Sequence, residues 1–229
     1  DLIESMVVPR TVAGGWTYLD VGCGNGAAAL HVADAFGLTV VGVDVDLEQI
    51  RIARHMAEGR RDVDFLPADA THLPFEDAHF DIVATNKTTH HIPAWRHALT
   101  EMERVLKPGG YLIFSDLALP AWLATHLRPV LAGRAGVFTV DDLEGVFAAM
   151  HLECVRKAAQ WHSYEAVFVK SRRVPPFRYK VARRTKIRSY NHHNRDCSDG
   201  EDERGHHRAG IVQIIEAVNR PVHEDGRKD

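Results

Sequence analysis

The chain has 229 residues, of which 45% are hydrophobic and 26% charged, an ordinary composition for a globular protein. Its formal net charge of -3 gives no whole-chain reason to expect a nucleic-acid partner. No apolar run approaches the roughly 18 residues that cross a membrane, and the first residues lack the basic start and apolar core of a signal peptide. We therefore expect a cytoplasmic protein.

Short apolar runs alternate along most of the chain with segments of helical periodicity. The predicted strands are Thr17–Val21, Thr39–Val43, Val63–Leu66, Asp81–Thr85, Tyr111–Ser115 and Glu165–Val169. The predicted helices are Ala27–Phe36, Leu47–Glu58, Trp95–Leu106 and Val140–Met150. Pro108, Gly109 and Gly110 are expected to end the third of these helices and lead into the next strand. Such alternation predicts an α/β fold with a parallel sheet covered on both faces.

The character of the sequence changes near Ser171. Residues 172–188 carry eight Lys or Arg and no acidic residue, and residues 196–203 then carry five Asp or Glu. A segment this polar buries too little apolar surface to offset its ordering entropy. We expect a cofactor-binding domain over residues 1–171 and a mobile appendage over 172–229. The basic run could bind phosphates, but it lacks the regular aromatic residues that stack on bases, so a solvated tail is the simpler interpretation.

The strongest local signal is Tyr18–Gly26, where an apolar strand leads through three glycines into a helix. Glycine is needed where the backbone turns sharply and must approach a ligand closely. Asp44 ends the next strand, 20 residues after Gly24, where a carboxylate can accept hydrogen bonds from ribose hydroxyls. The glycines read G-x-G-x-G with Asp20 before the first, which differs from the G-x-G-x-x-G of nicotinamide dehydrogenases. A nicotinamide cofactor is thus disfavoured.

At this point the chain resembles the class I methyltransferases that depend on S-adenosylmethionine (SAM). Leu19–Gly26 is similar to their first motif and Ala68–Ala70 to their segment after strand three. Phe80–Val83 looks like their fourth strand, and Glu101–Gly110 like their helix and turn before strand five. The resemblance covers roughly residues 17–116. It implies a Rossmann-like, doubly wound, mostly parallel seven-stranded sheet with helices on both faces, with SAM as the cofactor.

The resemblance also implies which residues bind SAM. Asp20 would help to position the ammonium group, and Asn86 with Lys87 would line the pocket near the methionine. Lys87 could equally be a solvated loop cation. The glycine loop against the methionine end consists of Gly22, Cys23, Gly24, Asn25 and Gly26.

The same resemblance implies an adenosine end. Asp44 would take the ribose hydroxyls, and Val45 would pack on the adenine. Asp69 with Ala70 would pair with the edge of the adenine ring, where the amino group lies.

Candidate catalytic residues follow the fourth and fifth strands, at the edge where open α/β sheets bind ligands. Methyl transfer from a sulfonium needs a base only if the acceptor must lose a proton. His90 and His91 are candidates, because histidine titrates near neutrality. Asp116 could orient the imidazole or share the acceptor's hydrogen bonds. Small-molecule and sugar O-methyltransferases look similar here, which puts His90 first, His91 second, and leaves a purely structural role open.

The acceptor is expected to be a small molecule, methylated on oxygen or carbon, as in ubiquinone, menaquinone and sugar methylation. Trp122 and His126 lie on a predicted helix that could cover it or merely pack on the sheet. Asn86 is followed by Lys87, not by the Pro-Pro-aromatic run of amino-methylating DNA and RNA enzymes. Two further His pairs, His192–His193 and His206–His207, fit no structural zinc spacing. A catalytically silent SAM-fold scaffold and an RNA-binding methyltransferase that uses the basic tail remain alternatives.

Overall fold

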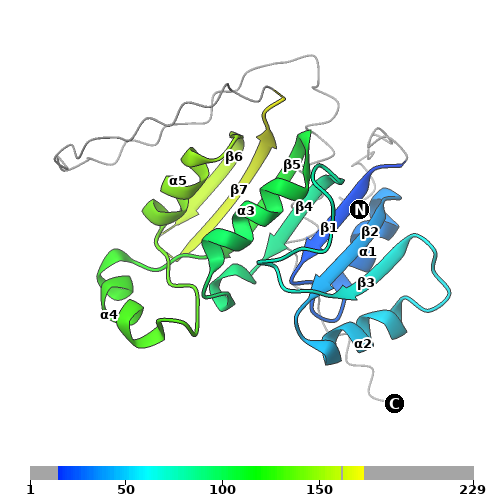
Figure 1. The fold of residues 1–229 in the computed structure, drawn as a ribbon, viewed down its shortest axis with the longest axis horizontal. Coiled ribbons are helices and arrows are strands. Elements are labelled where there is room, and N and C mark those ends of the chain that lie inside the picture. Colours follow the sequence, from blue (N-terminus) through cyan, green and yellow to red (C-terminus); the bar gives the residue numbers. More distant parts are fainter. Residues whose placement is uncertain (1–14, 161, 173–229) are drawn as a thin grey trace, which may run out of the picture.

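A computed structural model describes residues 15–160 and 162–172. Seven strands form one sheet in the order β3-β2-β1-β4-β5-β7-β6 (Figure 1). The strands are β1 (Thr17–Val21), β2 (Thr39–Asp44), β3 (Val63–Pro67), β4 (Phe80–Asn86), β5 (Leu106–Leu117), β6 (Leu152–Gln160) and β7 (Ser163–Lys170). Strands β1 to β5 are parallel, whereas β7 is antiparallel to both β5 and β6. The predicted mostly parallel, seven-stranded Rossmann-like sheet is confirmed.

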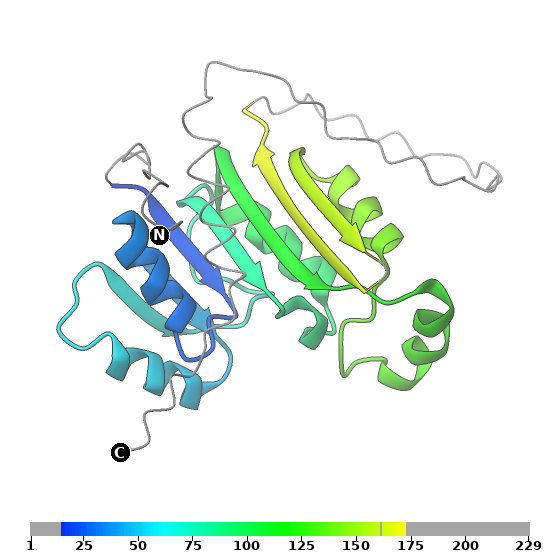
Figure 2. The ribbon, with the colours of Figure 1, turned by 180° about the vertical axis from the view of Figure 1, so that it is seen from behind.

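Helices cover both faces of this sheet. They are α1 (Ala27–Phe36), α2 (Leu47–Met56), the short 3-10 helix η1 (Thr89–His91), α3 (Trp95–Val105), α4 (Ala121–Leu131) and α5 (Val140–Ala149). Helices α3 and α5 lie in front of the sheet in Figure 1, and α1 comes to the front when the molecule is turned in Figure 2. Helix α4 covers neither face and lies beyond the carboxyl end of β5 in both views.

Burial on both faces explains why the central strands are easy to find in the sequence. In β1, Tyr18 joins the apolar cluster on the α1 side, whereas Leu19 joins the cluster on the α3 side. A strand that is covered on both faces reads as a continuous apolar run rather than as an alternating one. The predicted bounds of β1 and α1 are confirmed to the residue.

Apart from shifts of one or two residues at the ends of several elements, two elements differ from the sequence prediction. Strand β6 was not among the predicted strands, because at the edge of the sheet most of its side chains are exposed and several are charged. Pro108–Gly110 was expected to form a turn before the fifth strand. Instead β5 already begins at Leu106, and the pairing of β4 with β5 shifts register between Phe80 and Ile82.

The predicted boundary near residue 171 falls just after the last described strand, which ends at Lys170. Apart from Arg172, the predicted appendage of residues 172–229 lies outside the described residues. Within the described part of the chain, no helix is both long enough and apolar enough to cross a membrane.

Candidate active site

The glycine loop is fastened to the end of β2 by backbone hydrogen bonds. The N–H groups of Gly22 and Cys23 both donate to the Val43 carbonyl, at 2.8 and 3.0 Å. Gly22 has φ +80°, and a Cβ there would come within 2.2 Å of the Thr88 side chain, so only glycine fits. Gly26 has no room for a side chain either, because an added Cβ would lie 2.5 Å from the Phe65 ring. These two glycines let the loop pack against the protein.

Gly24 differs from the other two glycines of the loop. It has φ +52°, but the nearest atom to an added Cβ would be a Gln49 oxygen at 3.8 Å, so this part of the loop faces open space. Its two neighbours in the predicted loop serve the fold. The Cys23 side chain is buried in the core, and the Asn25 side chain accepts a hydrogen bond from the Ala27 N–H at the start of α1.

Asp44, at the end of β2, holds the loop from the other side. One carboxylate oxygen accepts the Gly24 N–H at 2.9 Å, and the other accepts the Asp46 N–H at 2.9 Å. Two bonds fix the orientation of the carboxylate, while a carboxylate has about four lone-pair sites. The carboxylate therefore keeps acceptor capacity for the hydroxyl groups of a ligand.

A cavity of about 580 Å³ opens in front of Asp44, a volume typical of small-molecule sites. Six predicted site residues line it: Gly22, Asp44, Val45, Asp69, Ala70 and His91. Val45 is 76% exposed, which leaves an apolar side chain free to contact a ligand. The opposite wall was missed in the sequence and includes Thr88, Ile92, Pro93 and Ala94. These residues come close to the ends of β2 and β3 only in the folded chain, so no local sequence pattern predicts the contact.

Asp69 enters the cavity from the loop after β3. One of its oxygens accepts both the N–H and the hydroxyl of Thr71, each at 2.8 Å. These hydrogen bonds, the backbone one first, lower the pKa of Asp69. Asp69 is thus an ionised acceptor whose other oxygen makes no hydrogen bond within the described part of the chain. Such an oxygen can accept from an amino group.

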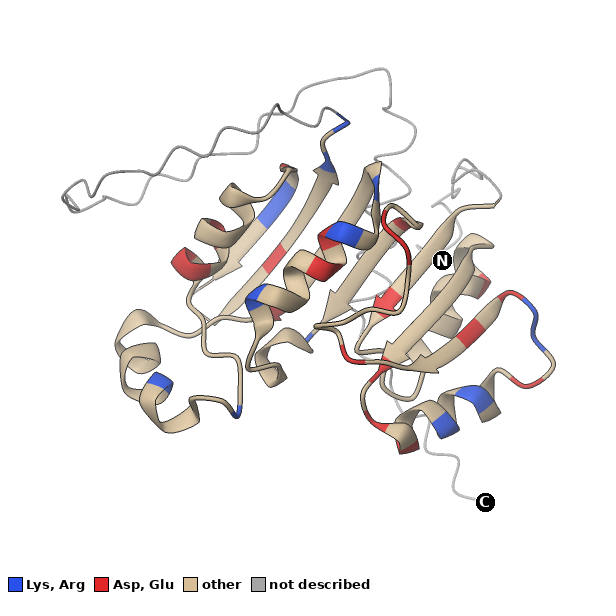
Figure 3. Ribbon diagram, viewed as in Figure 1, with Lys and Arg blue, Asp and Glu red and all other residues tan. Residues whose placement is uncertain are grey.

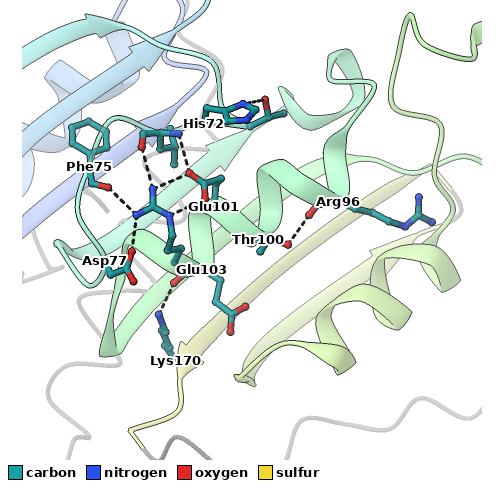
Figure 4. A network of polar contacts seen from close by, with 11 residues as sticks. His72, Phe75, Asp77, Arg96, Thr100, Glu101, Glu103 and Lys170 are labelled. Atoms are coloured by element: carbon teal, nitrogen blue, oxygen red, sulfur yellow. Dashed lines mark hydrogen bonds and ion pairs between the residues drawn. The ribbon is translucent and has the colours of Figure 1, made fainter. Parts of the chain in front are cut away.

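Arg104 of α3 ties down the loop that follows Asp69 (Figure 4). Its guanidinium donates to both carboxylate oxygens of Glu101, at 2.8 Å each, and to the carbonyls of Leu73 and Phe75. Glu101 in turn accepts the Leu73 N–H at 3.0 Å. The Glu101–Arg104 pair lies in the sequence motif before strand five, and it fixes the loop that carries Asp69 to the scaffold.

Asp20 is buried below the glycine loop, on β1. Burial first, and repulsion from Asp44 second, raise the pKa of Asp20 to about 7. Among the described residues no group donates a hydrogen bond to this carboxylate. A buried carboxylate without a donor is energetically unfavourable when ionised, so it favours a cationic partner. It does not line the cavity just described.

His90 and Asp116 form a hydrogen-bonded pair at the carboxyl edge of the sheet. The His90 Nδ1 lies 2.6 Å from Asp116 Oδ1, and the His90 N–H donates to Asp116 Oδ2 at 3.1 Å. Because a carboxylate oxygen accepts, we assign the ring proton to Nδ1, which leaves Nε2 with a free lone pair. The Asp116 side chain is fully buried, whereas that of His90 is 24% exposed. Gly136 N–H also donates to the His90 carbonyl.

His91 lies beside this pair but lines the cavity in front of Asp44. Its ring centre is 4.0 Å from that of His90. Asn86 and Lys87 end and follow β4 without lining the cavity. Lys87 has φ +52°, which is unusual for a residue with a side chain, and its N–H donates to the Ser115 carbonyl at 2.8 Å.

Trp122 and His126, the two residues predicted to bind the methyl acceptor, lie on α4 and do not line the cavity. Trp122 is 69% exposed. The His126 Nδ1 lies 2.6 Å from the Trp122 carbonyl, so His126 donates from Nδ1 and keeps Nε2 as an acceptor.

The cavity lies at the carboxyl ends of β1, β2 and β4, where doubly wound sheets bind their ligands. Residues 19–114 match the family model described as a methyltransferase domain. The resemblance predicted from the glycine loop and the later motifs is confirmed.

Curated relatives carry methyltransferase names. The 27-O-demethylrifamycin SV methyltransferase of Amycolatopsis mediterranei is 37% identical over 145 residues, which are 59% of this chain and 53% of that protein. The O-methyltransferase rstn1 of Aspergillus nomiae is 40% identical over 110 residues, 47% of this chain and 49% of that protein. The chain therefore spans about half the length of the curated relatives it matches.

Solved structures agree on the fold. A SAM-dependent methyltransferase from Methanosarcina mazei superimposes with a TM-score of 0.59 at 22% identity, over 69% of this chain and 93% of that one. At this level of identity the match concerns the fold, so the chemistry has to be argued from the site.

Proposed function

We propose that the protein is a SAM-dependent methyltransferase that methylates a hydroxyl oxygen of a small-molecule acceptor. The observation that carries the proposal is the His90–Asp116 pair, a base with its orienting carboxylate, next to a cavity suited to a nucleoside. The names of the two relatives, both of which specify oxygen, support an oxygen acceptor.

The residues at the cavity fit the chemical groups of SAM. Asp44 offers fixed acceptor oxygens to ribose hydroxyls, and Asp69 offers an ionised oxygen to the adenine amino group. Asp20, buried without a donor, suits the ammonium group of the methionine. The open space beside Gly24 leaves room for a ligand against the backbone. When bound, SAM would supply a methyl group on a sulfonium.

The His90 imidazole would remove the proton of the acceptor hydroxyl. Its Nε2 lone pair is free because Nδ1 is held by Asp116, and this tautomer is the one a general base needs. Once the ring is protonated, the buried Asp116 carboxylate stabilises the positive charge. The Asp116 bond to the His90 backbone and the Gly136 bond to its carbonyl hold the ring in place. Holding the base and the acceptor in a fixed geometry contributes much of the rate.

Transfer of a labelled methyl group tests this proposal. The protein would be incubated with methyl-labelled SAM and matched panels of phenols, alcohols, amines and carbon nucleophiles. We expect label in the hydroxyl panel as methyl ethers, and calorimetric binding of SAM in the absence of acceptor. SAM binding together with labelled amines or C-methyl products would overturn the assignment to oxygen. Absence of SAM binding would overturn the proposed function altogether.

A further inference from the structure

Exposed apolar side chains lie on the segment that directly follows Asp116. Leu117 directly follows Asp116 and is 44% exposed, whereas Trp122 and Val130 on α4 are 69% and 66% exposed. Trp122, His126 and Val130 recur at intervals of four residues, so they follow one another along one side of the helix. We call Leu117, Trp122, His126 and Val130 the α4 patch. The exposed faces of Trp122 and Val130 offer apolar surface that a ligand can cover.

The α4 patch is connected to the catalytic pair at both ends. Its first residue, Leu117, adjoins Asp116, and the Leu119 N–H donates to the Phe138 carbonyl at 2.9 Å. Past the helix, the Gly136 N–H donates to the His90 carbonyl at 2.9 Å. The segment from residue 117 to 138 is thus a loop closed onto η1 and β5. The segment that carries the patch therefore begins directly after Asp116 and returns to His90.

The chemistry of the patch favours hydrocarbon. Residues 117–138 contain no acidic residue, and their only Lys or Arg side chains are Arg128 and Arg134. Arg128 is engaged by Asp142 of α5. Figure 3 shows α4 almost free of charge, in contrast to α2 and α3. Ala124 is the one fully buried residue of α4, while Leu123, Leu127 and Leu131 are half-buried and Trp122 and Val130 are exposed. An apolar ligand that covers Trp122 and Val130 would add burial to this helix.

We propose that the α4 patch binds the hydrocarbon portion of an extended acceptor, a long-chain alcohol, whose hydroxyl reaches His90. This inference rests on the proposed function, and it adds the class of acceptor and the residues that select it. Affinity then grows with the length of the apolar part, since each buried methylene contributes about 0.8 kcal/mol.

Binding of straight-chain alcohols tests the patch without any turnover. The full chain, saturated with S-adenosylhomocysteine, would be titrated calorimetrically with 1-butanol, 1-hexanol, 1-octanol and 1-decanol. We expect affinity to rise about two- to fourfold for each methylene. Trp122→Ala should weaken 1-decanol binding by about tenfold or more, leave 1-butanol nearly unchanged, and flatten the series. Trp122→Phe should restore most of the slope.

The matched control is Met56→Ala, which removes an exposed apolar side chain from α2, away from the patch. It should leave the series unchanged. An identical slope in wild type and Trp122→Ala would overturn the proposal. So would a Trp122-dependent dimer in sedimentation, or Trp122-dependent binding to phosphatidylcholine vesicles, without any dependence on alcohol length. Failure of the proposed function would show separately, as lost binding of S-adenosylhomocysteine.

Discussion

The cofactor side and the acceptor side of the sheet edge are held together by different means. On the cofactor side, backbone N–H groups of the glycine loop bond to Val43 and Asp44, and the Arg104 network fixes the loop after Asp69. On the acceptor side, α4 fully buries only Ala124 and is connected through bonds at its two ends. The cofactor side is preorganised for one ligand, whereas the acceptor side exposes apolar surface that a ligand has to complete.

The largest effect that separates the two sides is expected from His90→Ala. Loss of the base should lower kcat by about 10²–10⁴, the usual contribution of a positioned base, with SAM affinity nearly unchanged. His91→Ala is the control, since that ring lines the cofactor cavity. It should weaken SAM binding more than it lowers kcat, and steady-state kinetics with calorimetry would separate the two effects. If His90→Ala kept a normal kcat and His91→Ala lost most of its kcat, His91 would be the base instead of His90.

A second comparison lies inside the glycine loop. Gly22→Ala forces a Cβ to within 2.2 Å of Thr88 at a left-handed φ, and we expect it to lower the free energy of unfolding by about 2–4 kcal/mol. Gly24→Ala has a similar φ but open space, so only backbone strain of about 1–2 kcal/mol should appear. Urea unfolding followed by circular dichroism measures both. Equal losses would contradict the distinction between a packed and an open glycine.

Asp44→Ala should affect SAM binding on a somewhat smaller scale. Loss of hydrogen bonds to a charged group costs roughly 1.5–3 kcal/mol, which calorimetry would register as weaker SAM affinity. Asp46→Ala is the control, because it removes the cap of α2 and leaves the Asp44 carboxylate in place. If Asp44→Ala bound SAM normally, the assignment of this residue to the ribose would be wrong.

These contrasts also mark what the sequence alone could predict. The sequence was enough to predict the strand before the glycine loop, the loop itself and Asp44. Burial on both faces restricts the residue types in the strand, and close approach of the backbone restricts those in the loop. Strand β6 could not be predicted, because most of its side chains are exposed and an exposed side chain can be charged. The cavity wall at Ile92–Ala94 arises from a tertiary contact. The ranking of His90 over His91 came from resemblance, and the Asp116 bond now gives it a physical basis.

The last comparison concerns protons on Asp20. Its pKa of about 7 in the ligand-free fold lies well above the usual value, because the carboxylate is buried and close to Asp44. The unliganded protein should therefore lose stability as pH rises from about 4 to 7, where the folded state binds more protons than the unfolded state. An ammonium group reverses this preference, since it favours the ionised carboxylate.

SAM binding should therefore strengthen as pH rises through about 7, the pKa of Asp20, and weaken by up to about tenfold per unit below it. Calorimetry between about pH 5.5 and 7.5 covers this limb while an α-amino group stays largely protonated. Asp20→Asn should bind SAM weakly at every pH, without the limb, yet should unfold at a higher urea concentration than wild type at pH 8, because it no longer buries a charge. Asp64→Asn, at an exposed position on β3, should retain the wild-type profile. A limb that persists in Asp20→Asn would assign the proton to another group and remove Asp20 from the ammonium site.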